Sequence, residues 1–116
     1  MKLYGIPNCD TVKKSRTWLT AHAIAHEFHD FKKQGLSAEL AQRWLQQMPW
    51  EQLINRKGQT WRNLPEEQKL TVSDSAAALQ LMLEKTSVIK RPLLELDGKL
   101  LHIGFDETAY QKLFNL

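Results

Sequence analysis

The pattern of hydrophobic and polar positions predicts strands near both ends of the chain and helices between them. A short apolar stretch over residues 1–6 is typical of a buried strand, and period-two alternation over residues 25–31 predicts a second one. Residues 10–22 carry apolar side chains at helical spacing, and Asp10 or Thr11 is the expected helix cap. This strand, helix, strand order favours two parallel strands joined by a crossover helix.

The middle third of the chain is predicted to be helical. Ser37 is a good N-cap for an amphipathic helix that ends at Pro49, and Ser73 or Asp74 caps another that runs to about Lys85. The intervening segment is rich in turn formers and basic residues, and it shows no strand pattern.

The last third returns to strands. Residues 93–96 and 99–103 flank Asp97-Gly98, a pair that readily adopts the positive φ angles of a type I′ hairpin turn. Asp106 is then placed to cap a final amphipathic helix. The predicted order is therefore βαβ, a helical segment and ββα, which is an α/β fold.

Composition narrows the class of protein. A chain of 116 residues with 42% hydrophobic and 25% charged residues is typical of one globular domain. A net charge of +3 is too small to indicate a nucleic-acid or membrane partner, but it suits small anions. No apolar run approaches the ~20 residues that span a bilayer, and the first residues lack the apolar core of a secretory signal, so we expect a cytoplasmic protein.

The single cysteine, Cys9, falls where the first strand gives way to the first helix. A thiol at a helix N-terminus is near the positive end of the helix dipole, which favours the thiolate. Lys13 and Arg16 add positive potential and Asp10 opposes it. The alternative is that Cys9 is only a small buried hydrophobic residue. Either way, no intramolecular disulfide can form, so a partner thiol would have to come from outside.

Four cations and one proline are further candidates for the site. Arg56, Lys57, Arg62 and Arg91 could bind an oxyanion if they converged, although solvated surface cations are the usual outcome. Pro92 follows Arg91 directly, and the residues alone favour an ordinary trans proline at the start of a strand.

The four histidines do not indicate a metal site. No HxH or HExxH spacing occurs, and His26 and His29 fall on opposite faces of the predicted strand. We therefore expect no bound metal.

Three segments together resemble the arsenate reductase (ArsC)/Spx family, and most closely its YffB-type branch of small thiol reductases. They are YGIPNCDTVKK at residues 4–14, Asn55-Arg56, and IKRPLL at residues 89–94, and they occur in the family order over nearly the whole chain. The resemblance implies a thioredoxin-like fold with a mixed four-stranded sheet. It also implies one domain over 1–116, in which residues 1–35 and 86–116 form the thioredoxin-like core and residues 36–85 form a helical insertion.

The resemblance also implies roles for individual residues. Cys9 matches the nucleophilic cysteine of the family, and Arg56 and Arg91 match two arginines that stabilise an oxyanion or thiolate beside it. Pro92 is expected to be cis and to lie opposite Cys9. Asn8, Lys13, Arg91 and Pro92 are the residues expected to bind the substrate or glutathione.

The function implied is that of a glutathione-dependent thiol–disulfide reductase. Glutathione would be the co-substrate, with no bound cofactor, and glutaredoxin is a further candidate partner. The substrate would be a disulfide or another small oxidised molecule. We expect a monomer with neither a membrane nor a nucleic acid as partner.

Three positions depart from the pattern of the relatives. Arsenate reductases place a histidine where this chain has Gly5, and a third arginine where it has residues 101–103. An arsenic oxyanion would lose a charge-assisted bond worth about 1.5–3 kcal/mol, which weighs against arsenate as the substrate. Spx-type regulators usually carry a second cysteine where this chain has Val12, so an intramolecular redox switch is excluded.

Three alternatives stay open on the sequence. One is arsenate reduction with glutathione and glutaredoxin. Another is a non-catalytic, Spx-like regulator that binds RNA polymerase. The last is a thioredoxin-like domain whose activity has lapsed.

Overall fold

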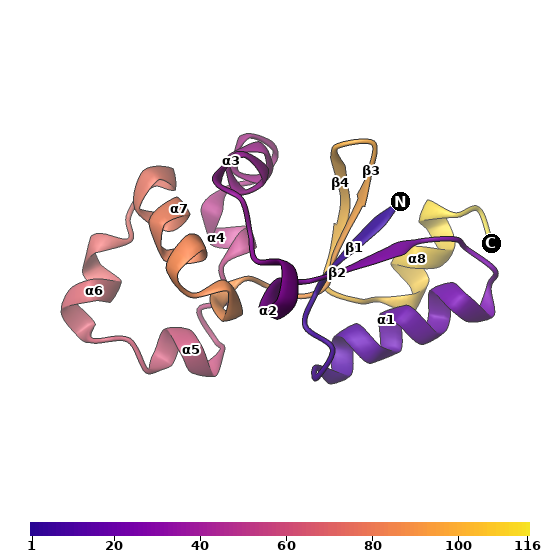
Figure 1. The fold of residues 1–116 in the computed structure, drawn as a ribbon, viewed down its shortest axis with the longest axis horizontal. Helices are drawn as coiled ribbons and strands as arrows, with labels where there is room; N and C mark the ends of the chain where they lie inside the picture. Colours follow the sequence, from indigo (N-terminus) through magenta and orange to yellow (C-terminus); the bar gives the residue numbers. More distant parts are fainter. The chain divides into compact units, whose positions relative to one another are not determined.

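The computed structural model describes residues 1–116, which form two compact units (Figure 1). The sheet unit combines residues 1–34 with residues 91–116, and the helical unit is residues 35–90. The sheet unit is therefore built from the two ends of the chain.

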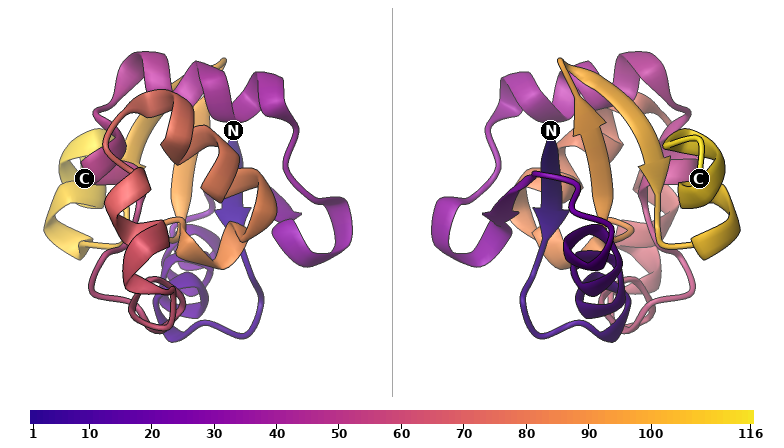
Figure 2. Two further views of the ribbon diagram at one scale, coloured as in Figure 1. Left: turned by 90° about the vertical axis from the view of Figure 1, so that its left-hand side faces the viewer. Right: turned by 90° about the vertical axis from the view of Figure 1, so that its right-hand side faces the viewer.

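A four-stranded mixed sheet forms the centre of the sheet unit (Figure 2). Its strands are β1 (Lys2–Gly5), β2 (Glu27–Asp30), β3 (Leu93–Leu96) and β4 (Lys99–Ile103), in the order β2-β1-β3-β4. β1 pairs in parallel with β2, whereas the β1–β3 and β3–β4 pairs are antiparallel. The thioredoxin-like topology expected from the resemblance is confirmed.

The hairpin turn between β3 and β4 follows the sequence prediction. Asp97 and Gly98 have φ angles of 50° and 83°, the positive values that a type I′ turn requires. The pairing shifts register between Leu94 and Glu95, so β4 carries one extra residue opposite them.

Two helices cover one face of the sheet. They are α1 (Asp10–Ala21) and α8 (Glu107–Leu113), and they lie on the same side of the strands in Figure 1. Their side chains share a buried apolar cluster with the strands, made of Leu3, Trp18, Leu19, Leu94 and Tyr110. This cluster fixes α1 against the sheet.

A third, short helix of the sheet unit, α2 (Phe31–Gln34), was not predicted. The Lys32 N–H donates to the Asp30 carboxylate at 2.9 Å directly after β2. Such a local side-chain bond turns the chain at the end of the strand, where residues 25–31 had suggested a continuous extended segment.

The helical unit contains no strand. Its helices are α3 (Ala38–Gln47), α4 (Trp50–Leu53), α5 (Gln59–Arg62), α6 (Glu66–Thr71), α7 (Ser75–Glu84) and the 3₁₀ helix η1 (Thr86–Val88). Ser37 caps α3 by accepting from the Leu40 N–H, as predicted. Of the two caps predicted for the second long helix, Ser73 and Asp74, it is Asp74 that caps α7, by accepting from the Ala77 N–H. None of the helices in the protein combines the length and the apolar character needed to cross a membrane.

A buried hydrogen bond joins the two helices that cover the sheet. The hydroxyl oxygens of Ser15 and Tyr110 lie 2.7 Å apart, and both residues are fully buried. Burial raises the pKa of Tyr110, with the Ser15 contact acting in the opposite direction, so the phenol is neutral at physiological pH. The bond satisfies two polar groups that have left water, which is costly to undo on one side only.

We predict that Tyr110→Phe destabilises the protein by about 1–3 kcal/mol, because the buried Ser15 hydroxyl loses its partner. Urea unfolding followed by circular dichroism measures the change. The double variant Ser15→Ala/Tyr110→Phe should recover part of the loss, since both polar groups are then gone. A double variant destabilised by the sum of the two single effects would contradict this account.

Candidate active site

Cys9 directly precedes α1 and occupies its N-cap position. The chain leaves β1 at Gly5, and Cys9 has an extended backbone with φ −143° and ψ 122°. Its carbonyl accepts the Lys13 N–H at 2.9 Å, which is the first turn of the helix. Asp10 and Thr11 were predicted to cap the helix, and this is wrong: both lie inside its first turn, because Cys9 already provides the extended capping position.

The electrostatic surroundings of Cys9 favour its charged form. Its side chain is partly exposed, and the amides of the first turn of α1 act on the sulfur. Burial raises the pKa of the thiol, but the Val12 N–H, the hydrogen bond and charge of Arg91, and the Thr11 N–H outweigh burial, so the pKa lies below its ordinary value. The free amides at the helix start and one guanidinium thus stabilise a thiolate.

The sheet order brings Arg91 to Cys9 although the two are far apart in sequence. β1 and β3 are antiparallel neighbours, with Tyr4 opposite Leu93. The last residues of β1 and the first residues of β3 therefore lie side by side at the same end of the sheet. The Arg91–Pro92 peptide bond is cis, as the resemblance implied and the residues alone did not. The Pro92 carbonyl accepts the Gly104 N–H at 2.8 Å, which ties this segment to the end of β4.

Gly5 leaves no room for a side chain beside the candidate nucleophile. It is buried, and a Cβ at this position would lie 2.8 Å from Cγ2 of Val12. The histidine that arsenate reductases carry at the corresponding position could not be accommodated here unless Val12 moved.

His102 and Lys13 are the two basic residues that could take the place of the missing third arginine. The His102 ring lies perpendicular to the Tyr110 ring, 5.5 Å between centroids, on the side of the sheet covered by α8. Burial lowers the pKa of His102, while the Asp106 charge acts in the opposite direction, so the ring is neutral at pH 7. His102 therefore supplies no positive charge. Lys13 is exposed one turn after Cys9.

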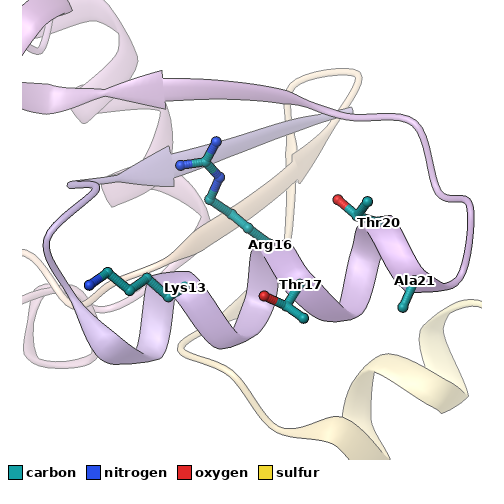
Figure 3. A pocket seen from close by; sticks show the side chains of 5 residues that line it. All are labelled: Lys13, Arg16, Thr17, Thr20 and Ala21. Atoms are coloured by element: carbon teal, nitrogen blue, oxygen red, sulfur yellow. The ribbon is translucent and has the colours of Figure 1, made fainter.

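An open pocket of about 540 Å³ runs along α1 from this turn onward (Figure 3). It is lined by Lys13, Arg16, Thr17, Thr20 and Ala21. Figure 3 shows the Lys13 side chain reaching back toward the start of the helix and Arg16 directed toward the strands. The Arg16 guanidinium lies 4.2 Å from the centroid of the Phe28 ring, which leaves Lys13 as the pocket's cation nearest to Cys9 along the helix.

Arg56 belongs to the helical unit. Its guanidinium lies 5.4 Å from the centroid of the Trp50 ring. The preceding residue, Asn55, forms a tight turn in which its side chain accepts the Lys57 N–H at 3.2 Å and its carbonyl accepts the Gly58 N–H at 3.2 Å. Convergence of Arg56 on Cys9 stays a prediction, as does any role of Lys57 or Arg62, which are exposed in the same unit.

Three histidines pack on aromatic rings, a feature that the sequence pattern did not reveal. Ring centroids are 3.9 Å apart for His22 and Trp18, and 4.9 Å apart for His29 and Tyr4. His102 packs on Tyr110 as described above. No group of three or more His, Cys, Asp or Glu side chains is placed to hold a metal ion.

We predict that Arg91→Met raises the pKa of Cys9, because the variant removes both a hydrogen bond to the sulfur and a nearby positive charge. The pKa is read from the pH profile of thiolate absorbance. As the pH is lowered, the Cys9 thiolate of Arg91→Met should become protonated at a higher pH than that of the wild-type protein. Arg16→Met is the matched control. It removes the same charge from a guanidinium that lies on Phe28 and that, contrary to the expectation from the sequence, is not among the groups that lower the pKa of Cys9. Equal profiles for wild type and Arg91→Met would refute the role of Arg91.

Comparison with known proteins points to one family. The model of the ArsC family matches residues 4–113. The regulatory protein MgsR of Bacillus subtilis is 30% identical in an alignment that covers 97% of this chain and 89% of MgsR.

Two solved structures are similar in sequence and in fold. An arsenate reductase (ArsC) related protein from Brucella melitensis is 52% identical, with a TM-score of 0.79, over 99% of this chain and 94% of its own. A protein described as YFFB is 47% identical, with a TM-score of 0.89, over 96% of each chain. The similarity therefore extends over both units.

Proposed function

The chain belongs to the ArsC family, and from that premise we propose that it is a glutathione-dependent thiol–disulfide reductase whose nucleophile is Cys9. The observation that carries the proposal is the position of the sulfur. It lies at the start of α1, beside Arg91 and the first free amides of the helix, and these groups lower its pKa. A thiolate near neutral pH is the reactive form in disulfide exchange.

The reaction takes place in two exchange steps at Cys9. The Cys9 thiolate attacks one sulfur of the substrate disulfide, a new sulfur–sulfur bond forms on Cys9, and the other half leaves as a thiolate that takes up a proton. The thiolate of glutathione then attacks the substrate sulfur of the mixed disulfide, a sulfur–sulfur bond forms between glutathione and that half of the substrate, and Cys9 leaves as a thiolate. A second glutathione thiolate attacks the glutathione sulfur of this product away from the protein, which releases the substrate thiol and leaves oxidised glutathione. The second step needs an external thiol, because Cys9 is the only cysteine in the chain.

The remaining predicted residues would bind and orient glutathione. Arg91 stabilises the leaving and attacking thiolates and is suited to a carboxylate. The backbone beside Pro92 would pair with the extended tripeptide, and Asn8 is exposed in the loop before Cys9. Lys13 can attract the second carboxylate, because its side chain extends toward the start of α1 (Figure 3). The role of Arg56 stays a prediction that rests on the family resemblance alone.

Arsenate is the second candidate substrate, supported by the description of the relative from Brucella melitensis as an arsenate reductase related protein. The same Cys9 thiolate would attack the oxyanion. Two features disfavour it: Gly5 leaves no side chain at the position of the family histidine, and His102 is neutral. An oxyanion intermediate would then depend on fewer charged donors.

We predict that oxidised glutathione forms a mixed disulfide with the protein, visible by mass spectrometry as one glutathione on the peptide that contains Cys9. Reduced glutathione should remove it. Cys9→Ser is the control that abolishes the adduct, since an alcohol does not exchange with a disulfide. Absence of any adduct on the folded wild-type protein would overturn the proposal.

Two further assays on the wild-type protein distinguish the reductase from the arsenate reductase and from the regulator. The reductase proposal predicts no measurable turnover of arsenate in the presence of glutathione and glutaredoxin, whereas an arsenate reductase would consume it. A regulator that binds RNA polymerase would capture the polymerase from a lysate equally well with wild type and Cys9→Ser.

A further inference from the structure

A close packing contact joins the end of β1 to the first turn of α1, the turn that follows Cys9. Gly5 is the last residue of β1 and Val12 is in the first turn of α1, and both are buried. A Cβ on Gly5 would lie 2.8 Å from Val12 Cγ2, and the next nearest atoms also belong to Val12, at 3.6 and 3.8 Å. The valine side chain thus fills the space that a side chain at position 5 would need.

The Val12 side chain cannot readily change its conformation to make room for a Cβ at position 5. A valine in a helix strongly prefers one χ1 rotamer, because both of its methyl groups branch at Cβ next to the backbone. The side chain is 0% exposed, so no rotation carries it into solvent. A methyl group at position 5 would therefore displace the backbone of the first turn of α1, or of the end of β1, by a few tenths of an ångström.

The same residue acts on Cys9 through its backbone. Burial raises the pKa of the Cys9 thiol, and the largest single contribution that lowers it is the hydrogen bond from the Val12 N–H. Arg91 lowers it through a hydrogen bond and through its charge, and the Thr11 N–H also contributes. The effect of an amide dipole on a sulfur depends steeply on distance and direction. A displacement of this turn would consequently weaken the stabilisation of the thiolate.

We propose that the lack of a side chain at Gly5 makes room for Val12 and so lets the first turn of α1 pack close to β1, with the Val12 N–H against the Cys9 sulfur. Both are positioning residues, because neither side chain reaches the reacting atoms. The functional meaning of the pair rests on the proposed reductase mechanism, but its geometry concerns the free protein alone.

Four variants test the pair on the full-length protein: Gly5→Ala, Val12→Ala, Gly5→Ala/Val12→Ala and Val88→Ala. The readout is the Cys9 pKa, from the pH profile of the rate of alkylation by iodoacetamide. Val88→Ala is the matched control, because Val88 is equally buried but lies in the helical unit. It reports what the loss of two buried methyl groups does elsewhere.

We expect Gly5→Ala to move the midpoint of the profile to higher pH, while Val12→Ala and Val88→Ala leave it near the wild-type position. At a pH below the midpoint, Gly5→Ala should be alkylated about threefold or more slowly than wild type. The rate falls by less than the thiolate fraction does, because a thiolate of higher pKa is also more nucleophilic. The double variant should return to the wild-type midpoint, because the methyl group of Ala at position 5 enters the space left by Val12.

Two results would overturn the proposal: a folded Gly5→Ala protein with the wild-type midpoint, or a double variant that keeps the raised midpoint. If Gly5→Ala fails to fold, the double variant decides. A folded double variant with the wild-type midpoint supports the pair, and an unfolded one refutes it. Failure of the reductase proposal is seen separately, as the absence of a glutathione adduct on the wild-type protein.

Discussion

The stabilisation of negative charge on one sulfur is the interaction on which the proposed chemistry depends. A thiol of ordinary pKa is mostly protonated at neutral pH and exchanges slowly. Here Cys9 takes the extended position at the start of α1, where the amides that follow have no carbonyl partner in the helix. Those amides and Arg91 provide the compensation for a partly buried thiolate.

The rest of the sheet unit holds these groups at the correct distance. The β1–β3 pairing places Arg91 and the cis Pro92 beside the end of β1, and the core beneath α1 keeps the helix start in register with that edge. Packed helices and strands around a charged site limit the motion of its groups, which would otherwise weaken the short-range electrostatic interactions with the charge. The Ser15–Tyr110 bond and the Gly5–Val12 contact belong to this support.

Local chemistry explains which parts of the fold were predictable from the sequence. The Asp97-Gly98 turn and the caps Ser37 and Asp74 depend on residues adjacent in the chain, and all three were predicted. A contact between two particular residues on different elements leaves no periodic pattern in the sequence. The Gly5–Val12 contact therefore emerged only from the structure.

The candidate site shows the same division. The location of Cys9 at a strand-to-helix junction followed from the apolar pattern, but its role as the capping residue did not, because Asp10 and Thr11 are stronger caps by residue type. The cis state of Pro92 followed from the family resemblance and not from the residues themselves. The contribution of Arg56 depends on the arrangement of the helical unit and stays a prediction.

A single labelled atom tests the central claim most directly. Because Cys9 is the only cysteine, a protein grown with cysteine labelled by ¹³C at Cβ gives one cysteine resonance, whose shift reports the ionisation of the thiol. Titration of this signal should give a midpoint below the ~8.5 of a free cysteine. A midpoint at or above that value in the folded protein would contradict a stabilised thiolate and, with it, the proposed mechanism.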